Sequence, residues 1–204
     1  RGMRVLALSY KWMDVQNPSE LSRGEVESDL QFCGFIAFEC RTRADSNIVC
    51  RALLDSSHRV AMATGDAPLT ALHVARATNI ANPDSLALLL SADEDDEVLR
   101  WVSPHSPPKC DPIKFDVASV GDLVRQQFAL VVTEAAIVDA ASRAAETATA
   151  AVPAESETAV DKNSTEKTDA VKAAEEAAEE SVWSACAEHV CVFARMSPQG
   201  KARI

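Results

Sequence analysis

The sequence has 204 residues, of which 47% are hydrophobic, and a formal net charge of −11 at pH 7. A chain of this length can bury one sizeable hydrophobic core. Nucleic-acid binding requires a basic face, whereas the net charge of this chain is strongly negative, so we expect no nucleic-acid partner. No apolar run in the sequence approaches the roughly 20 residues of a membrane-spanning helix.

Two strands and a short helix are predicted at the start of the chain. Residues 4–10 (RVLALSY) have the composition of a buried strand, and residues 30–39 (LQFCGFIAFE) that of a central strand. Between them, Ser22 and Glu25 have the spacing of a capping box, which predicts a helix over residues 23–29.

The next segment alternates between helix and strand patterns. Apolar spacing predicts a helix over residues 45–56, a strand over 60–63 and a second helix in which Pro68 occupies the first turn. Residues 64–66 (TGD) break the strand, and Asp66 is the predicted N-cap. This succession favours a parallel sheet, and the N–H groups of the turn would face an anion at its carboxyl edge.

The pattern weakens beyond residue 80. We expect a strand over residues 85–90, a solvated loop at the acidic run 93–97 and a proline-rich surface loop over 104–112. Regular structure returns with a strand over residues 128–133 and a short helix over 134–141.

A low-complexity stretch follows and separates these elements from the last strand. Residues 140–180 are rich in Ala, Glu and Thr and contain ten acidic and four basic residues. Because they offer almost no large apolar side chains to offset ordering entropy, we expect a disordered and dispensable insertion. A helix is expected over residues 170–183, and a core strand over residues 191–194.

None of the polar clusters has the spacing of a metal site. His58 and His73 have no partner at metal spacing, and the run at residues 93–97 lacks further positioned ligands. The cysteines form no C-x-x-C pair, so we expect no metal site. We expect their thiols to be buried and reduced, as in a cytosolic compartment. The six cysteines are Cys33, Cys40, Cys50, Cys110, Cys186 and Cys191.

Three motifs resemble those of the P-type ATPases, which are membrane pumps with a cytosolic phosphorylation domain of the haloacid-dehalogenase class. Residues 64–75 (TGDAPLTALHVA) are similar to TGDNxLTAxxVA. Residues 1–7 (RGMRVLA) resemble the GxRVLA strand that closes the family's nucleotide-binding domain, and residues 192–201 (VFARMSPQGK) resemble VFARxxPxxK. The resemblance covers residues 1–80 and 183–204 well.

Shorter matches point to one subgroup of this family. Residues 44–46 (ADS), 56–60 (SSHRV) and 68–75 (PLTALHVA) look most like the type-five subgroup of the endoplasmic reticulum. Because the chain begins at Arg1 rather than Met and ends just after a motif lysine, we expect it to be part of a longer protein.

The resemblance implies an α/β fold: a haloacid-dehalogenase-like, Rossmann-type parallel sheet with helices on both faces. It assigns residues 1–40 to the C-terminal part of a nucleotide-binding domain. The phosphorylation domain then takes residues 41–139 and 183–204, and the low-complexity acidic insertion takes residues 140–182.

The resemblance also implies catalytic residues. The family transfers the γ-phosphate of ATP to an aspartate, with Mg²⁺, and then hydrolyses the aspartyl phosphate. Thr64 and the Gly65 N–H would hold phosphoryl oxygens, and Asp66 would fix the turn and meet the nucleotide. Lys201 would place a positive charge on the transferring phosphate.

Cofactor binding is implied for two arginines as well as for Asp66. The arginine at the position of Arg4 contacts nucleotide phosphates in the family, and Arg195 matches an arginine at the domain interface. The family's nucleophile motif DKTGT and its Mg²⁺-binding GDGxND are absent from these 204 residues. The one D-x-D lies within residues 93–96 and does not follow a clear buried strand.

The predicted function is therefore the cytosolic part of an ATP-driven transporter of the endoplasmic reticulum membrane. Its partners would be ATP, the remaining domains of the pump and membrane-embedded segments elsewhere in it. The transported cargo stays open between cations and transmembrane segments. Two alternatives also stay open: a free-standing phosphatase of the same fold class, and a non-catalytic interaction module that uses the acidic insertion.

Overall fold

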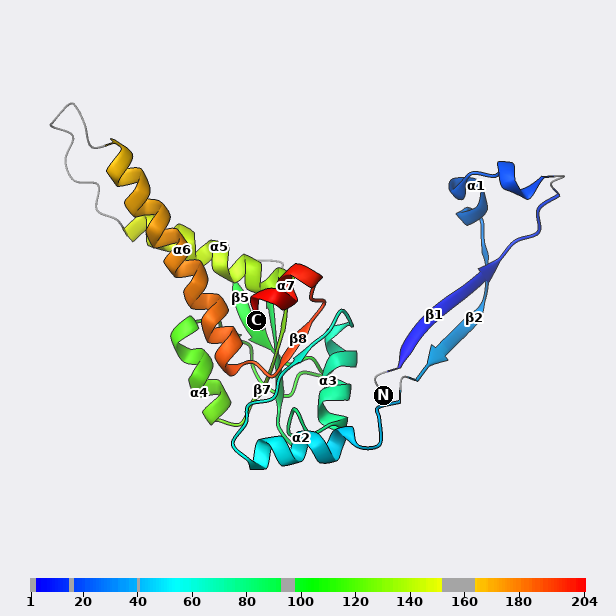
Figure 1. The fold of residues 1–204 in the computed structure, drawn as a ribbon. Coiled ribbons are helices and arrows are strands. Elements are labelled where there is room, and N and C mark those ends of the chain that lie inside the picture. The colour runs from blue at the N-terminus through cyan, green and yellow to red at the C-terminus, as the bar shows by residue number, and fades with distance from the viewer. Residues whose placement is uncertain (1–2, 15–16, 40, 93–97, 152–163) are drawn as a thin grey trace. The chain divides into compact units, whose positions relative to one another are not determined.

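The computed structural model describes residues 3–14, 17–39, 41–92, 98–151 and 164–204 (Figure 1). The chain divides into two compact units, Arg1–Arg41 and Thr42–Ile204. Among the described helices, none is both long enough and apolar enough to cross a bilayer.

The first unit is built on a two-stranded antiparallel sheet. Strand β1 (Arg4–Tyr10) pairs with strand β2 (Gln31–Phe38). The pairing shifts by one residue where Leu8 faces Gly34 and the next residue of β1 faces Phe32. This β-bulge lies at the glycine of β2, a position at which strands are commonly irregular.

The connection between these strands contains the predicted helix. A short 3-10 turn (Pro18–Glu20) precedes α1 (Arg23–Glu27). The Ser22 hydroxyl accepts a hydrogen bond from the Glu25 N–H at 3.3 Å, and the Glu25 carboxylate accepts one from the Ser22 N–H at 2.8 Å. The capping box is thus confirmed.

The predicted burial of both strands is wrong. Every residue of β1 is exposed, and in β2 Gly34 alone is partly buried. Apolar composition predicted the strands correctly, but burial needs a second layer, and the described residues of this unit place none over either face. The exposed large apolar side chains of the two strands are Val5, Leu6, Leu8, Tyr10, Phe32, Phe35, Ile36 and Phe38.

The second unit contains a six-stranded sheet in the order β3-β8-β7-β4-β5-β6. Strands β3, β8, β7 and β4 are parallel, whereas β5 and β6 join the edge beside β4 in antiparallel pairs. The strands are β3 (Met62–Ala63), β4 (Ala87–Ala92), β5 (Leu99–Val102), β6 (Ile113–Lys114), β7 (Ala129–Thr133) and β8 (Val192–Ala194).

The sheet is therefore mixed, and the expectation of a wholly parallel sheet is corrected. The four strands predicted within this unit are the parallel ones, and β5 and β6 were not predicted. Strand β4 ends at Ala92 and β5 begins at Leu99. A connection this short cannot hold a crossover helix, so the two strands pair as an antiparallel hairpin.

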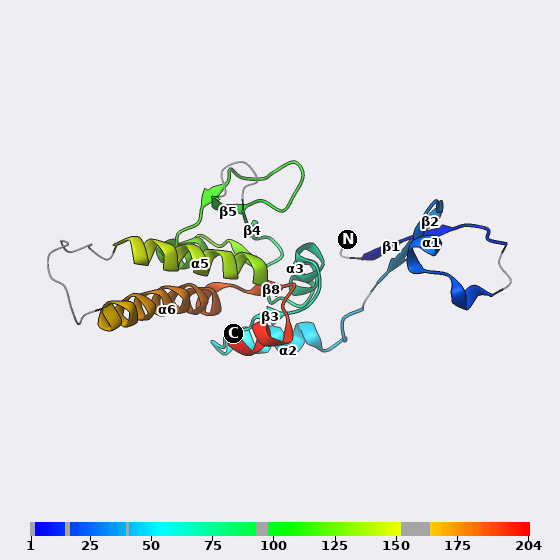
Figure 2. The same ribbon diagram turned by 90° about the horizontal axis from the view of Figure 1, so that it is seen from above.

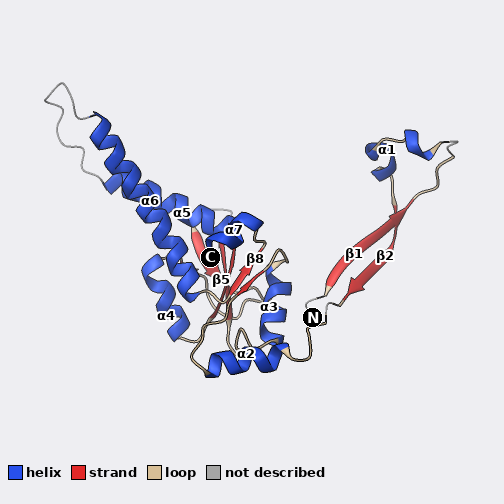
Figure 3. Cartoon of the chain, viewed as in Figure 1, coloured by secondary structure: helices blue, strands red, loops and turns tan. Residues whose placement is uncertain are grey.

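Helices cover both faces of this sheet, as expected (Figure 3). The predicted helix over residues 45–56 is present as α2. The helices of the unit are α2 (Ser46–Asp55), α3 (Pro68–Ala77), α4 (Val120–Arg125), α5 (Glu134–Ala151), α6 (Ser164–His189) and α7 (Pro198–Arg203), with a 3-10 turn, η2 (Val117–Ser119).

Alternation along the central strands divides the core into two layers. In β7, Leu130 and Val132 face the layer formed with α4, α5 and α6, whereas Val131 faces the layer beneath α3. The α3 layer is lined by small residues such as Ala71 and Ala75, which let that helix lie close to the sheet. This alternation is the two-residue period of a strand buried on both faces.

The expectation of disorder is wrong for residues 140–151 and 164–169, which are helical, whereas the helix expected over residues 170–183 is confirmed as part of α6. Helix α5 continues to Ala151, and α6 begins at Ser164 and lies beside it (Figure 2). Ala140, Ala141 and Ala145 of α5 are buried. Alanine has the highest intrinsic helix propensity and fills a close helix interface, so the lack of large apolar side chains did not mean disorder.

Candidate functional site

Three neighbouring parallel strands, β3, β8 and β7, bring their carboxyl ends to one edge of the sheet. Residues 64–66 follow β3, residues 195–197 follow β8, and α5 begins directly after β7. In open α/β sheets, ligands bind at this edge. The predicted TGD turn and the VFARxxPxxK motif therefore lie at the same place.

The turn after β3 is closed by its own side chains. The Thr64 hydroxyl donates to the Asp66 carboxylate at 3.1 Å and accepts from the Asp66 N–H at 3.1 Å. Gly65 between them is exposed. The N-cap of α3 is Ala67 rather than the predicted Asp66, because the Asp66 side chain is turned back to Thr64. Pro68 is in the first turn of α3, as predicted.

The segment after β8 is hydrogen-bonded to this turn through its backbone. The Arg195 N–H donates to the Asp66 carbonyl oxygen at 3.0 Å, and the Met196 N–H donates to the Thr64 carbonyl oxygen at 2.9 Å. Arg195 has a φ of 54°, a left-handed conformation that is uncommon outside glycine. The side chain of Arg195 is exposed. The two motifs thus form one backbone unit.

Helix α7 follows this segment and carries Lys201. Its N-cap is Ser197, whose hydroxyl accepts from the Gly200 N–H at 3.0 Å, and Pro198 occupies the first turn. The Lys201 N–H donates to the Ser197 carbonyl oxygen at 3.0 Å. Lys201 is exposed, and its backbone is placed by the first turn of the helix.

Glu134, which the sequence analysis did not single out, lies beside this N-cap. Its carboxylate accepts from the Ser197 N–H at 2.6 Å and from the Ser197 hydroxyl at 2.7 Å. The hydrogen bond from the Ser197 backbone, and then that from its hydroxyl, lower the pKa of Glu134 below its ordinary value. Ser197-Pro198 is a local signal for a helix start that was not used, and no local signal links it to Glu134, which is distant along the chain.

Of the six predicted site residues, four meet at this turn, Lys201 is on the helix that follows, and Arg4 belongs to the other unit. Thr64, Gly65 and Asp66 form the turn to which Arg195 is hydrogen-bonded. Lys201 follows on the helix that starts at Ser197. Arg4 belongs to the first unit, where it pairs in register with Phe38.

No three His, Cys, Asp or Glu side chains gather as a metal site in the described parts of the chain. The five cysteines described there are all free thiols. Burial raises the pKa of Cys186 to about 12 and also raises that of Cys191, so both are poor nucleophiles. Cys33 is exposed, contrary to the expectation of buried thiols.

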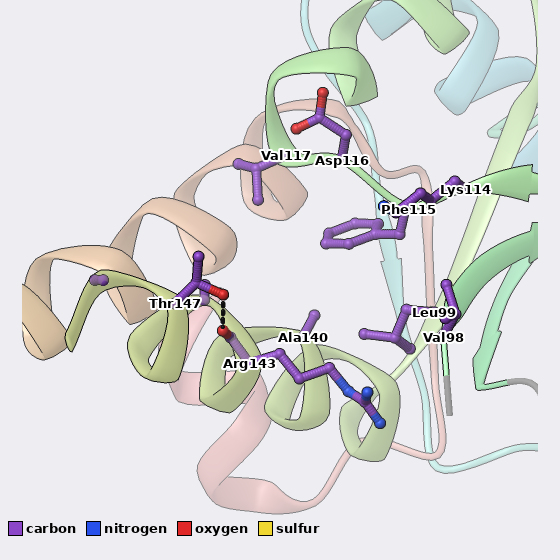
Figure 4. Close-up of a pocket in the computed structure, with 11 residues that line it drawn as sticks. Val98, Leu99, Lys114, Phe115, Asp116, Val117, Ala140, Arg143 and Thr147 are labelled. Atoms are coloured by element: carbon purple, nitrogen blue, oxygen red, sulfur yellow. Dashed lines mark hydrogen bonds between the residues drawn. The ribbon is translucent and has the colours of Figure 1, made fainter. Parts of the chain in front are cut away.

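A pocket of about 650 Å³ lies elsewhere, between α5 and the segment from β5 to η2 (Figure 4). Phe115 and Leu99 point into it across from Ala140 of α5. None of the site residues predicted from the sequence lines it. One wall of this pocket is therefore formed by α5, within the stretch that was expected to be disordered.

Curated proteins match the chain over about half of its length, whereas no protein-family model matches it. The endoplasmic reticulum transmembrane helix translocase spfA of Aspergillus fumigatus is 48% identical over 103 residues, 47% of this chain and 8% of that protein. The probable manganese-transporting ATPase PDR2 of Arabidopsis thaliana is 44% identical over 108 residues, 51% of this chain and 9% of that protein. The probable cation-transporting ATPase 13A5 of Homo sapiens is 36% identical over 100 residues, 48% of this chain and 8% of that protein.

These relatives confirm the resemblance to the P-type ATPases. Relatives from Schizosaccharomyces pombe and Saccharomyces cerevisiae, at 41% and 42% identity, are also named endoplasmic reticulum transmembrane helix translocases. The resemblance to the type-five subgroup is thereby confirmed as well. The chain spans 8 to 9% of the length of these curated relatives.

Proposed function

We propose that this chain is part of the cytosolic catalytic region of a P-type ATPase. Residues 41–139 and 183–204 belong to a haloacid-dehalogenase-like phosphorylation domain, and residues 1–40 end a nucleotide-binding domain. The division of the chain after Arg41 supports this boundary. Residues 140–151 and 164–182 contribute helices to the phosphorylation domain.

One observation carries the proposal: the turn at residues 64–66 and the segment at 195–197 are joined by backbone hydrogen bonds at the carboxyl edge of the parallel strands. Those segments are the two family motifs to which the resemblance assigns phosphate chemistry. Their meeting at the edge where α/β sheets bind ligands supports a shared phosphoryl site.

The residues present at this edge fit a phosphoryl group. Gly65 is exposed, so its N–H can approach phosphoryl oxygens closely. The single hydroxyl proton of Thr64 is donated to Asp66 in the structure, so this hydroxyl becomes a donor to phosphate when it turns away from that carboxylate. Asp66 holds the Thr64 hydroxyl and keeps the turn in shape. The N-terminus of α3 directly after the turn favours negative charge.

Full positive charge at the site comes from Lys201, which we assign to the transferring phosphate. Arg195 lies at the interface between the phosphorylation and nucleotide-binding domains. Arg4, in the nucleotide-binding domain, contacts the phosphates of ATP. ATP supplies the phosphoryl group, with Mg²⁺ as its counter-ion. The acceptor aspartate and the Mg²⁺ ligands lie outside these 204 residues, since DKTGT and GDGxND are absent from them.

In the whole protein we propose ATP-driven transport in the endoplasmic reticulum membrane, with this part in the cytosol. Trapping of the phosphoenzyme from labelled ATP tests the proposal on the full-length protein. A phosphorylated aspartate, released by hydroxylamine, is the expected product. A full-length protein that takes up no label at saturating ATP and Mg²⁺ would overturn the assignment.

The purified 204-residue chain separates this proposal from the alternatives. We expect it to bind ATP weakly or not at all and to hydrolyse neither ATP nor a simple phosphate ester. Turnover of a phosphate ester by this chain alone would favour the free-standing phosphatase. An open reading frame that starts close to Arg1 and encodes no membrane span would favour the interaction module.

A further inference from the structure

Helix α7 is attached to the rest of its unit at its N-cap by a carboxylate. Both oxygens of Glu134 are occupied by Ser197, one by its backbone N–H at 2.6 Å and one by its hydroxyl at 2.7 Å. Glu134 is the first residue of α5, so its carboxylate lies at the N-terminal end of both helices. Negative charge is favoured at such a position.

The other end of α7 is attached to α6. The guanidinium of Arg203 lies 4.6 Å from the centroid of the buried Trp183 ring, a cation–π contact. The same guanidinium is 3.9 Å from a carboxylate oxygen of Glu179 and 3.9 Å from one of Glu180. Glu179 and Glu180 belong to the low-complexity acidic stretch, within the part of it for which a helix was expected.

Between these two attachments lies a helix of six residues that carries Lys201. A helix this short is not stable by itself in water, so its position depends on tertiary contacts. The middle of α7 is also closely packed, because a Cβ built on Gly200 would lie 2.5 Å from a carboxylate oxygen of Glu134. A lysine on a flexible stem is placed only as well as the backbone that carries it.

We propose that Glu134 and Arg203 are positioning residues that fix the two ends of α7 and so hold Lys201 at the edge of the sheet. Glu134 acts through Ser197, and Arg203 acts through Trp183 and the two neighbouring glutamates of α6. The role given to Lys201 rests on the proposed function, whereas the attachment of α7 does not. The α5–α6 hairpin thereby becomes part of the support for the phosphoryl site.

Amide hydrogen exchange on the 204-residue chain tests the attachment directly. The amides of α7 in Glu134→Ala and in Arg203→Ala should lose most of their protection, while those of β7 and β8 keep theirs. Glu134→Gln keeps one acceptor oxygen and should lose less. Asp139→Asn is the matched control, because Asp139 lies on α5 and its ion pair, at 3.0 Å, is with Arg143 of the same helix.

Unchanged protection of α7 in both alanine variants would overturn the attachment. An equal loss in α7, β7 and β8 would also overturn it, since that result means a general loss of stability. Arg203→Lys keeps the charge but not the planar group over Trp183, so it should restore protection only in part.

Phosphoenzyme formation by the full-length protein tests the effect on Lys201. Glu134→Ala should slow it by up to about 10²-fold, the cost of a misplacement of about 1 Å, with the half-saturating ATP concentration unchanged. In the Lys201→Ala background, Glu134→Ala should cause almost no further loss, because the residues act as a unit. A normal rate in Glu134→Ala, or a full additional loss in the double variant, would overturn the positioning role.

The two experiments fail in different ways. A wild-type protein that forms no phosphoenzyme overturns the proposed function, and the exchange experiment still decides whether α7 is held by Glu134 and Arg203. Normal phosphoenzyme in the wild type together with a normal rate in Glu134→Ala overturns the positioning role and leaves the proposed function standing.

Discussion

The Met196 N–H donates a hydrogen bond to the Thr64 carbonyl oxygen at 2.9 Å. With the neighbouring bond from the Arg195 N–H to the Asp66 carbonyl oxygen at 3.0 Å, it joins two motifs that are far apart in the sequence. Because both bonds use backbone atoms alone, side-chain substitutions at these positions leave the donors and acceptors in place. Variants of the site residues therefore test chemistry more than folding.

Lys201 is the residue whose removal should affect phosphoryl transfer most. Loss of one electrostatic stabiliser of a transition state costs on the order of 10²–10³ in rate. We expect that loss of phosphoenzyme formation in Lys201→Ala of the full-length protein, measured by rapid quench with labelled ATP. Lys201→Arg should recover part of the rate, since a planar guanidinium replaces a compact ammonium imperfectly.

Thr64 provides the comparison within the same site. Thr64→Ala should cost less than Lys201→Ala, because a neutral donor is weaker than a charged one. Thr64→Ser keeps the hydroxyl that bonds to Asp66 and is the matched control. Wild-type rates in Lys201→Ala would remove this lysine from the mechanism.

Gly200 should be sensitive to a single methyl group. A Cβ at this position would lie 2.5 Å from Glu134 Oε1 and 2.9 Å from the Met196 side chain, so Gly200→Ala must displace the carboxylate. Alanine is otherwise the better helix former by about 1 kcal/mol. We expect Gly200→Ala to destabilise the wild-type chain but to become neutral or stabilising in the Glu134→Ala background.

Urea unfolding of the wild-type chain, the two single variants and the double variant measures this reversal. The change in unfolding free energy caused by Gly200→Ala should reverse its sign, or fall to zero, when the Glu134 carboxylate is absent. The same destabilisation in both backgrounds would show that the collision is with Met196 rather than with Glu134.

The hydrogen bonds from Ser197 to Glu134 should respond to acid. Since the folded-state pKa of Glu134 is lowered, the stability it contributes is present above the ordinary glutamate pKa of about 4.3 and is lost as the pH falls through the lowered value. The Ser197 amide resonance should move in that acidic range as the carboxylate becomes protonated.

Two substitutions control this nuclear magnetic resonance titration. Glu134→Gln should abolish the movement of the Ser197 resonance. Glu25→Gln should leave it unchanged, because the Glu25 carboxylate accepts from Ser22 in the first unit and its pKa is lowered by that separate side-chain and backbone contact. A Ser197 resonance that is independent of pH in the wild type would contradict the bond.

The helical hairpin of α5 and α6 should be essential to the stability of the second unit. Ala141 is 3% exposed, so Ala141→Asp places an unpaired charge in the core and should lower the unfolding free energy by at least about 2 kcal/mol. Ser142→Asp, on the exposed neighbour, is the control and should change it by less than about 0.5 kcal/mol. Equal stability of the two variants, by thermal or urea unfolding, would restore the disordered interpretation.

The sequence predicted the elements of the site better than their surroundings. The strand before residue 64, the helix from Pro68 and the strand at residues 191–194 were all predicted from local spacing. Local patterns succeed there because glycine, proline and apolar periodicity act within a few residues. The assignment of Asp66 as N-cap failed because Thr64 competes for the same side chain.

Burial was predicted less well than secondary structure. Strands β1 and β2 formed as their composition indicates but are exposed, whereas the alanine-rich helix α5 is buried at Ala140 and Ala141. Composition measures how much apolar surface a segment offers. Whether that surface is covered depends on a second layer that the segment does not itself contain.

The sequence alone determined the family resemblance, the capping box of α1 and the strand–helix alternation at the site. The tertiary structure decided that β3, β8 and β7 are neighbours, that Thr64 meets Met196, and that Glu134 meets Ser197. Propensity and capping are interactions between residues a few positions apart, and so they are written in the local sequence. Strand order and the partner of a carboxylate depend on which distant segments are brought together when the core is buried, and no local pattern carries that information.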